Sequence, residues 1–62
     1  MKNTEWRREL EEMPFDMRFE MEDGTTELCH ATGYEVNFED PNDRSEWWNE
    51  YVSKDGEYFY GR

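Results

Sequence analysis

An aromatic-rich stretch near the C-terminus constrains the fold more than any other part of this chain. Residues 47–60 hold six of the eleven aromatic residues, and the run Ser-Lys-Asp-Gly at 53–56 divides them into two groups. Aromatic and β-branched residues favour strands, and glycine readily adopts the positive φ of a tight turn. The pattern predicts a β-hairpin that turns at Gly56, with the rest of the chain packed on it.

The same stretch resembles the first hairpin of WW domains. The resemblance rests on the spacing of Trp48, Gly56 and the aromatic pair Phe59-Tyr60, and it covers residues 48–60. The third strand and second tryptophan of that family have no counterpart after Arg62. The resemblance therefore implies a hairpin and no further property of the family.

A helix competes with a strand just before this turn. Asp43 and Glu46 have the spacing of a helix capping box, and Trp47 and Tyr51 lie four residues apart, as neighbours on one helical face do. Aromatic residues and valine are mediocre helix formers and favour strands. We expect a strand here, with a second helix at about 44–53 as the alternative.

Residues 3–13 predict a short N-terminal helix. Polar residues at its start can cap it, and Pro14 ends it. Trp6, Leu10 and Met13 fall at positions i, i+4 and i+7, which gives one apolar stripe. A helix this short is marginal alone, so we expect the stripe to pack on a sheet.

Two central segments alternate between apolar and charged residues, as strands with one buried face do. They are residues 15–22 and 34–39, and the turn pair Asp23-Gly24 leads from the first into a returning strand at 25–31. We predict a single small acidic domain over residues 1–62. Its fold class is α+β, a short N-terminal helix packed on a four- to five-stranded antiparallel sheet.

Charge limits the classes of partner. Seven Lys and Arg stand against seventeen Asp and Glu, a formal net charge of −10. Such a chain repels nucleic acid and anionic membranes and is attracted to basic surfaces. No apolar run reaches the length of a signal peptide or a membrane span. The single cysteine cannot form an internal disulfide, which favours a reducing compartment, and we expect a cytoplasmic protein.

The residue types do not predict an enzyme, a metal site or a cofactor. One cysteine and one histidine, Cys29 and His30, cannot supply the roughly four ligands of a structural zinc site. As strand neighbours they also point to opposite faces. We expect Cys29 to be a small semi-buried residue, while His30 shares the parity of Leu28 and is expected either inside or at the sheet rim.

Acidic strand faces and surplus aromatic residues are the remaining clues to function. Carboxylates at this density can compete for a groove lined with Lys and Arg, and adjacent tryptophans on a strand cannot both be buried in a single-layer sheet. The predicted partner-binding residues are acidic or aromatic: Asp16, Glu20, Glu22, Glu35, Glu39, Trp47, Trp48, Tyr51 and Tyr58.

From these clues we expect a non-enzymatic binding protein that occupies a basic, nucleic-acid-binding site of a larger host enzyme. In physical type it is similar to the small acidic inhibitors of phages and mobile elements, including anti-restriction and anti-CRISPR proteins. It would bind no nucleic acid and no membrane itself. The alternative is a small structural or regulatory subunit bound through the aromatic hairpin, and exposed aromatic residues would also suit a homodimer.

Overall fold

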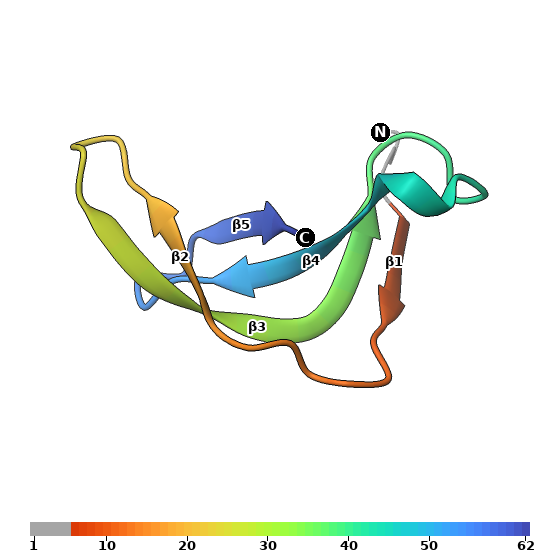
Figure 1. The fold of residues 1–62 in the computed structure, drawn as a ribbon, viewed down its shortest axis with the longest axis horizontal. Coiled ribbons are helices and arrows are strands. Elements are labelled where there is room, and N and C mark those ends of the chain that lie inside the picture. The colour runs from red at the N-terminus through yellow and green to blue at the C-terminus, as the bar shows by residue number, and fades with distance from the viewer. Residues whose placement is uncertain (1–5) are drawn as a thin grey trace.

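The computed structural model describes residues 6–62, which form one five-stranded antiparallel sheet. The elements are the strands β1 (Trp6–Glu9), β2 (Met17–Glu20), β3 (Thr26–Asn37), β4 (Trp47–Val52) and β5 (Tyr58–Gly61), with a 3-10 turn at Arg44–Glu46 before β4. Strands β1, β3, β4 and β5 lie side by side in that order, and β2 pairs with β3. Figure 1 shows the sheet strongly curved rather than flat.

Strand β3 is the longest element, and it bends in its middle (Figure 1). Its N-terminal half pairs with β2, and its C-terminal half pairs with β1. The register with β4 shifts between Ala31 and Glu35, and Gly33, between them, has a φ of 95°. Only glycine adopts this conformation at little cost, so Gly33 lets one strand serve both halves of the sheet.

The bend places β2 against the inner face of β4 and β5. The Phe19 ring lies 5.3 Å from that of Tyr51 and 5.1 Å from that of Phe59, centroid to centroid. Cys29, beside them on β3, is fully buried, and Tyr51 is only 3% exposed. Aromatic contacts of this kind add to the burial of apolar area. This cluster is the apolar core of the molecule.

A polar cluster is buried on the opposite face of the sheet. The Glu50 carboxylate accepts hydrogen bonds from Arg7, from the Thr32 hydroxyl at 2.9 Å and from the Tyr60 hydroxyl at 3.2 Å. Val36, on the same face, is fully buried. Burying a charge is costly unless it is paired and hydrogen-bonded, and this one is.

The predicted N-terminal helix at 3–13 is wrong, so the fold is all-β rather than α+β. Residues 6–9 form β1, and residues 3–5 lie outside the described residues. The apolar spacing of Trp6, Leu10 and Met13 fits a helix, but a single short helix has little stability of its own. Pairing with β3 instead gives Arg7 and Arg8 acidic partners on opposite faces of the sheet, at Glu50 and Glu35.

The alternative of a second helix at about 44–53 is also wrong. Asp43 does cap a turn there, since its carboxylate accepts a hydrogen bond from the Ser45 N–H at 3.0 Å. The turn ends after three residues, and the chain continues as β4, which pairs with β3 and β5. The strand preference of the aromatic residues, supported by two pairing partners, overrides the capping signal. The hairpin predicted around Gly56 is confirmed, and Gly56 has a φ of 92°.

Candidate functional site

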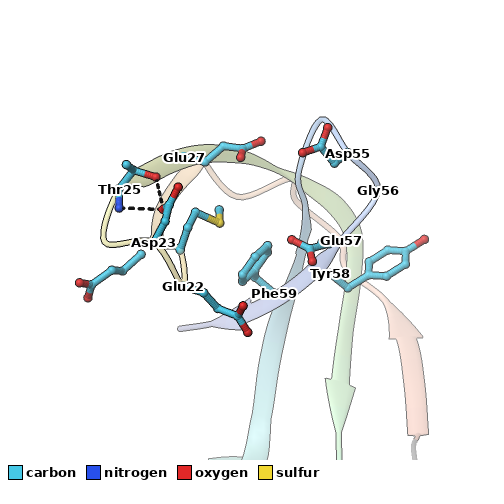
Figure 2. Close-up of a pocket in the computed structure, with 11 residues that line it drawn as sticks. Glu22, Asp23, Thr25, Glu27, Asp55, Gly56, Glu57, Tyr58 and Phe59 are labelled. Carbon is cyan, nitrogen blue, oxygen red and sulfur yellow. Dashed lines mark hydrogen bonds between the residues drawn. The ribbon is translucent and has the colours of Figure 1, made fainter.

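The candidate site is an acidic cleft between the tips of two hairpins. One wall is the end of β2 with its turn into β3, and the other is the β4–β5 turn with the start of β5. The cleft has a volume of about 690 Å³. Figure 2 shows the Phe59 ring between the two tips, with Glu22 and Asp23 on one side and Asp55 and Glu57 on the other.

Both walls end in the same five-residue turn, at 21–25 and 53–57. In each, the first residue donates its N–H to the carbonyl of the fifth, at 2.7 and 2.8 Å, and the glycine N–H returns to the first carbonyl at 3.0 Å. The glycines Gly24 and Gly56 have φ values of 89° and 92°. An Asp-Gly pair suits this turn, because glycine takes the left-handed position without strain.

Six carboxylates line the cleft, and among residues 6–62 no Lys, Arg or His side chain lines it. They are Glu20, Glu22, Asp23, Glu27, Asp55 and Glu57. Carboxylates gathered on two facing walls create a negative potential between them. The cleft can therefore attract cationic groups.

Two of these acids are fixed by hydrogen bonds. Asp23 accepts from the Thr25 N–H at 3.1 Å and from its hydroxyl at 2.7 Å. These bonds hold the pKa of Asp23 below its ordinary value, so this carboxylate keeps its charge to a lower pH than an ordinary aspartate does. Glu27 accepts the backbone N–H of Lys54 at 3.2 Å, which joins β3 to the β4–β5 turn.

The floor of the cleft is apolar and includes Met21 and Phe59. Below it, burial raises the pKa of the Cys29 thiol, and the charges of Glu27 and Glu57 raise it further. Only a thiolate is a strong nucleophile, so this thiol is chemically quiet at neutral pH. Among residues 6–62, no group of three or more His, Cys, Asp or Glu side chains is placed to hold a metal ion.

The predicted acidic site residues do not all come together. Glu20 and Glu22 line the cleft. Asp16 instead pairs with His30 Nδ1 at 2.8 Å, and Glu35 is bound to Arg8. The fifth, Glu39, is exposed in the loop after β3, outside the cleft.

The predicted aromatic site residues are mostly covered. The guanidinium groups of Arg8 and Arg62 each lie 4.0 Å from a ring centroid, that of Trp47 and that of Trp48 respectively. Tyr51 is buried in the core, and only Tyr58, 58% exposed, is open to solvent at the cleft. Of these four predicted residues, only Tyr58 therefore presents an exposed aromatic ring to a partner.

Four acids of the cleft were missed by the sequence analysis: Asp23, Glu27, Asp55 and Glu57. Asp23, Asp55 and Glu57 lie within the two Asp-Gly turns, and Glu27 follows the first turn in the chain. The turns themselves were recognisable from the sequence. That the two tips meet depends on the bend of β3, for which the sequence offers only Gly33 as a signal.

Comparison with known protein families, with curated proteins and with solved structures found no significant match. Within residues 6–62, no helix is long and apolar enough to cross a membrane.

Proposed function

We propose that this chain is a non-enzymatic binding protein whose acidic cleft docks on a basic, nucleic-acid-binding site of a larger enzyme in the cytoplasm. The observation that supports the proposal is the set of six carboxylates on two facing walls with no basic side chain among them. Charge complementarity of this kind speeds association and selects the partner. The net charge of −10 adds long-range attraction to any basic surface.

Blocking such a site would make the protein an inhibitor that competes with nucleic acid. In physical type this resembles the acidic inhibitors that phages and mobile elements use against host defence enzymes. The walls end in short, hydrogen-bonded turns, and hydrogen bonds hold the carboxylates of Asp23 and Glu27 in place before binding. Preorganisation lowers the entropy lost on association.

The alternative, a subunit held by the aromatic hairpin, has less support. Arginine side chains cover both tryptophan rings, and Tyr51 is buried. Hot spots of interfaces are usually aromatic or arginine side chains that reach the partner. Of the four predicted aromatic anchors, Tyr58 alone is exposed, and it belongs to the cleft.

The test is affinity capture from a bacterial lysate at about 50 mM and about 500 mM salt, because screening weakens exposed charge interactions. We expect a nucleic-acid enzyme to be retained at low salt, lost at high salt and displaced by DNA or RNA. The triple variant Glu20→Gln, Glu22→Gln and Glu57→Gln should lose it.

The matched control removes three acids outside the cleft: Glu9→Gln, Glu11→Gln and Glu12→Gln. It has the same net charge as the cleft variant and should retain the partner. Equal loss in both triple variants would show that only net charge matters. Capture that does not change with salt would overturn the proposal.

A further inference from the structure

Strand β5 is an edge strand. It pairs with β4, and no other strand within residues 6–62 pairs with it. The Ser53 N–H bonds to the Glu57 carbonyl at 2.8 Å, so the next pair along this antiparallel ladder, Val52 with Tyr58, is a non-hydrogen-bonded pair. The backbone N–H and C=O of Tyr58 therefore point away from β4, towards the side where a further strand could pair.

The cleft lies at this edge. Strand β2, which pairs with β3, supplies the facing wall through Glu20, and β5 supplies Tyr58 and Phe59. At the far end of β5 the two strands meet, since a Cβ on Gly61 would lie 2.8 Å from Met17 Sδ and 3.3 Å from Phe19 Cζ. The gap between β2 and β5 is thus closed at one end and open towards the turns. The cleft volume of about 690 Å³ leaves room for a short extended segment.

The lining selects the side chains of such a segment. Along an added strand, alternate side chains point to opposite faces. Those pointing inward would lie over the apolar floor, Met21 and Phe59, beside Glu27 and Glu57. Lys and Arg fit this environment, because their aliphatic stems pack on apolar surface while their charged ends reach carboxylates.

Charge also decides between occupants. A second copy of this chain would bring another net charge of −10 and a second acidic cleft to the same edge. Nucleic acid would be repelled for the same reason. An extended peptide with Lys or Arg at alternate positions offers both backbone pairing and the opposite charge.

We infer that the partner inserts an extended, basic segment into the cleft, where it pairs with the backbone of β5 at Tyr58 as an added strand. The inference rests on the proposed function for the sign of the charge, and it adds the conformation of the bound segment. Pairing through the backbone provides affinity, and the carboxylates provide specificity.

The test uses synthetic peptides of alternating Lys and Val, with free or N-methylated backbone amides. N-methylation keeps the charge but removes the donors that a strand needs. We expect the unmethylated peptide to bind at least tenfold more tightly. A Glu-Val peptide should not bind. Equal binding of the methylated and unmethylated peptides, or no binding of either, would overturn strand addition.

Two variants test the same pairing from the protein side. Tyr58→Pro removes the outward N–H, and proline is tolerated on edge strands, whereas Tyr58→Ala removes the ring and keeps the donor. We expect tenfold weaker binding for the proline variant and less than threefold for the alanine variant. Similar losses in both would argue against pairing, and if Tyr58→Pro does not fold, the methylated peptide decides. Loss of strand addition with salt-sensitive capture intact would leave the proposed function standing.

Discussion

Arg7 donates a hydrogen bond of 2.9 Å to the carboxylate of Glu50, although the Glu50 side chain is only 2% exposed. The two residues lie on β1 and β4, so their ion pair crosses the intervening strand β3. Hydroxyl groups of Thr32 and Tyr60 donate to the same carboxylate. This cluster ties the short N-terminal strand β1, whose four residues are all exposed, to the centre of the sheet.

Removing the cation should leave a buried carboxylate with less compensation. We expect Arg7→Met to lower the free energy of unfolding by about 1–3 kcal/mol, since it leaves a buried acceptor poorly satisfied. Arg8→Met, which removes the more exposed pair with Glu35, should cost less than about 1 kcal/mol. Urea unfolding of both variants measures the difference. Equal costs would show that the burial of Glu50 does not matter.

Asn37 organises the loop that follows β3. Its side chain is fully buried, accepts the N–H groups of Glu39 at 2.7 Å and Asp40 at 2.9 Å, and donates to the Asp40 carbonyl at 2.6 Å. At about 1 kcal/mol for each net hydrogen bond, Asn37→Ala should cost about 2–3 kcal/mol. Asn42→Ala, an exposed change in the same loop, should be nearly neutral in the same unfolding assay.

Gly61 marks the contact between β2 and β5. A methyl group there would meet Met17 Sδ at 2.8 Å, and because the methionine side chain can move, we expect Gly61→Ala to destabilise the protein by about 1 kcal/mol through overpacking. Shortening the neighbour with Met17→Ala should recover part of this loss in a double-mutant cycle.

Gly24→Ala is the matched control for that cycle. A Cβ at Gly24 has no atom within 4 Å, but the residue has a φ of 89°. Its cost is therefore conformational, about 1 kcal/mol, and Met17→Ala should not relieve it. Additive effects of Gly61→Ala and Met17→Ala would contradict the contact.

The Asp23 carboxylate links stability to pH. Thr25 donates to it and lowers its folded pKa below the unfolded value, so its contribution is present above about pH 4 and is lost as pH falls through the folded pKa. Asp23→Asn has no such titration. The stability difference between the two proteins should therefore shrink from pH 5 to pH 2 in urea unfolding. A constant difference would mean that charge is unimportant in this turn.

The tryptophan residues should matter for folding more than for binding. Trp48→Ala removes a half-buried ring covered by Arg62, and we expect a loss of about 1–3 kcal/mol in stability. Its affinity for the basic peptide should change by less than twofold, measured on the folded fraction. A large loss of affinity for a captured partner with stability intact would instead favour the alternative of a subunit bound through the aromatic hairpin.

Local signals predicted the two turns and missed the strand held by distant contacts. Asp-Gly pairs identified both hairpin tips, because the glycine conformation they need is local. Strand β1 depends on Arg7 and Arg8 meeting acids far along the chain, which no local pattern reveals. The apolar spacing of Trp6, Leu10 and Met13 therefore predicted a helix where the structure has a strand.

The inner face of β3 also differs from the prediction. The shared parity of Leu28 and His30 allowed an inward face for both, yet Leu28 is 44% exposed and His30 is exposed, whereas Cys29 between them is fully buried. Cys29 pairs with Met17 across the β2–β3 ladder, which puts it on the side of the core. A slip of one residue in register inverts a whole strand face, so composition alone does not decide it. The cleft combines both problems, since its lining comes from β2, β3 and β5, which are brought together only by the pairing and curvature of the whole sheet.

The acidic lining of the cleft has a consequence for how copies of this protein behave together. A strand edge that can accept a basic segment can also accept the same edge of another molecule, which is how sheet proteins begin to aggregate. The carboxylates beside Tyr58 oppose that pairing, because two negatively charged strand edges repel each other. Acid would neutralise these carboxylates and high salt would screen them, so the protein should stay dispersed only while the repulsion between its copies persists.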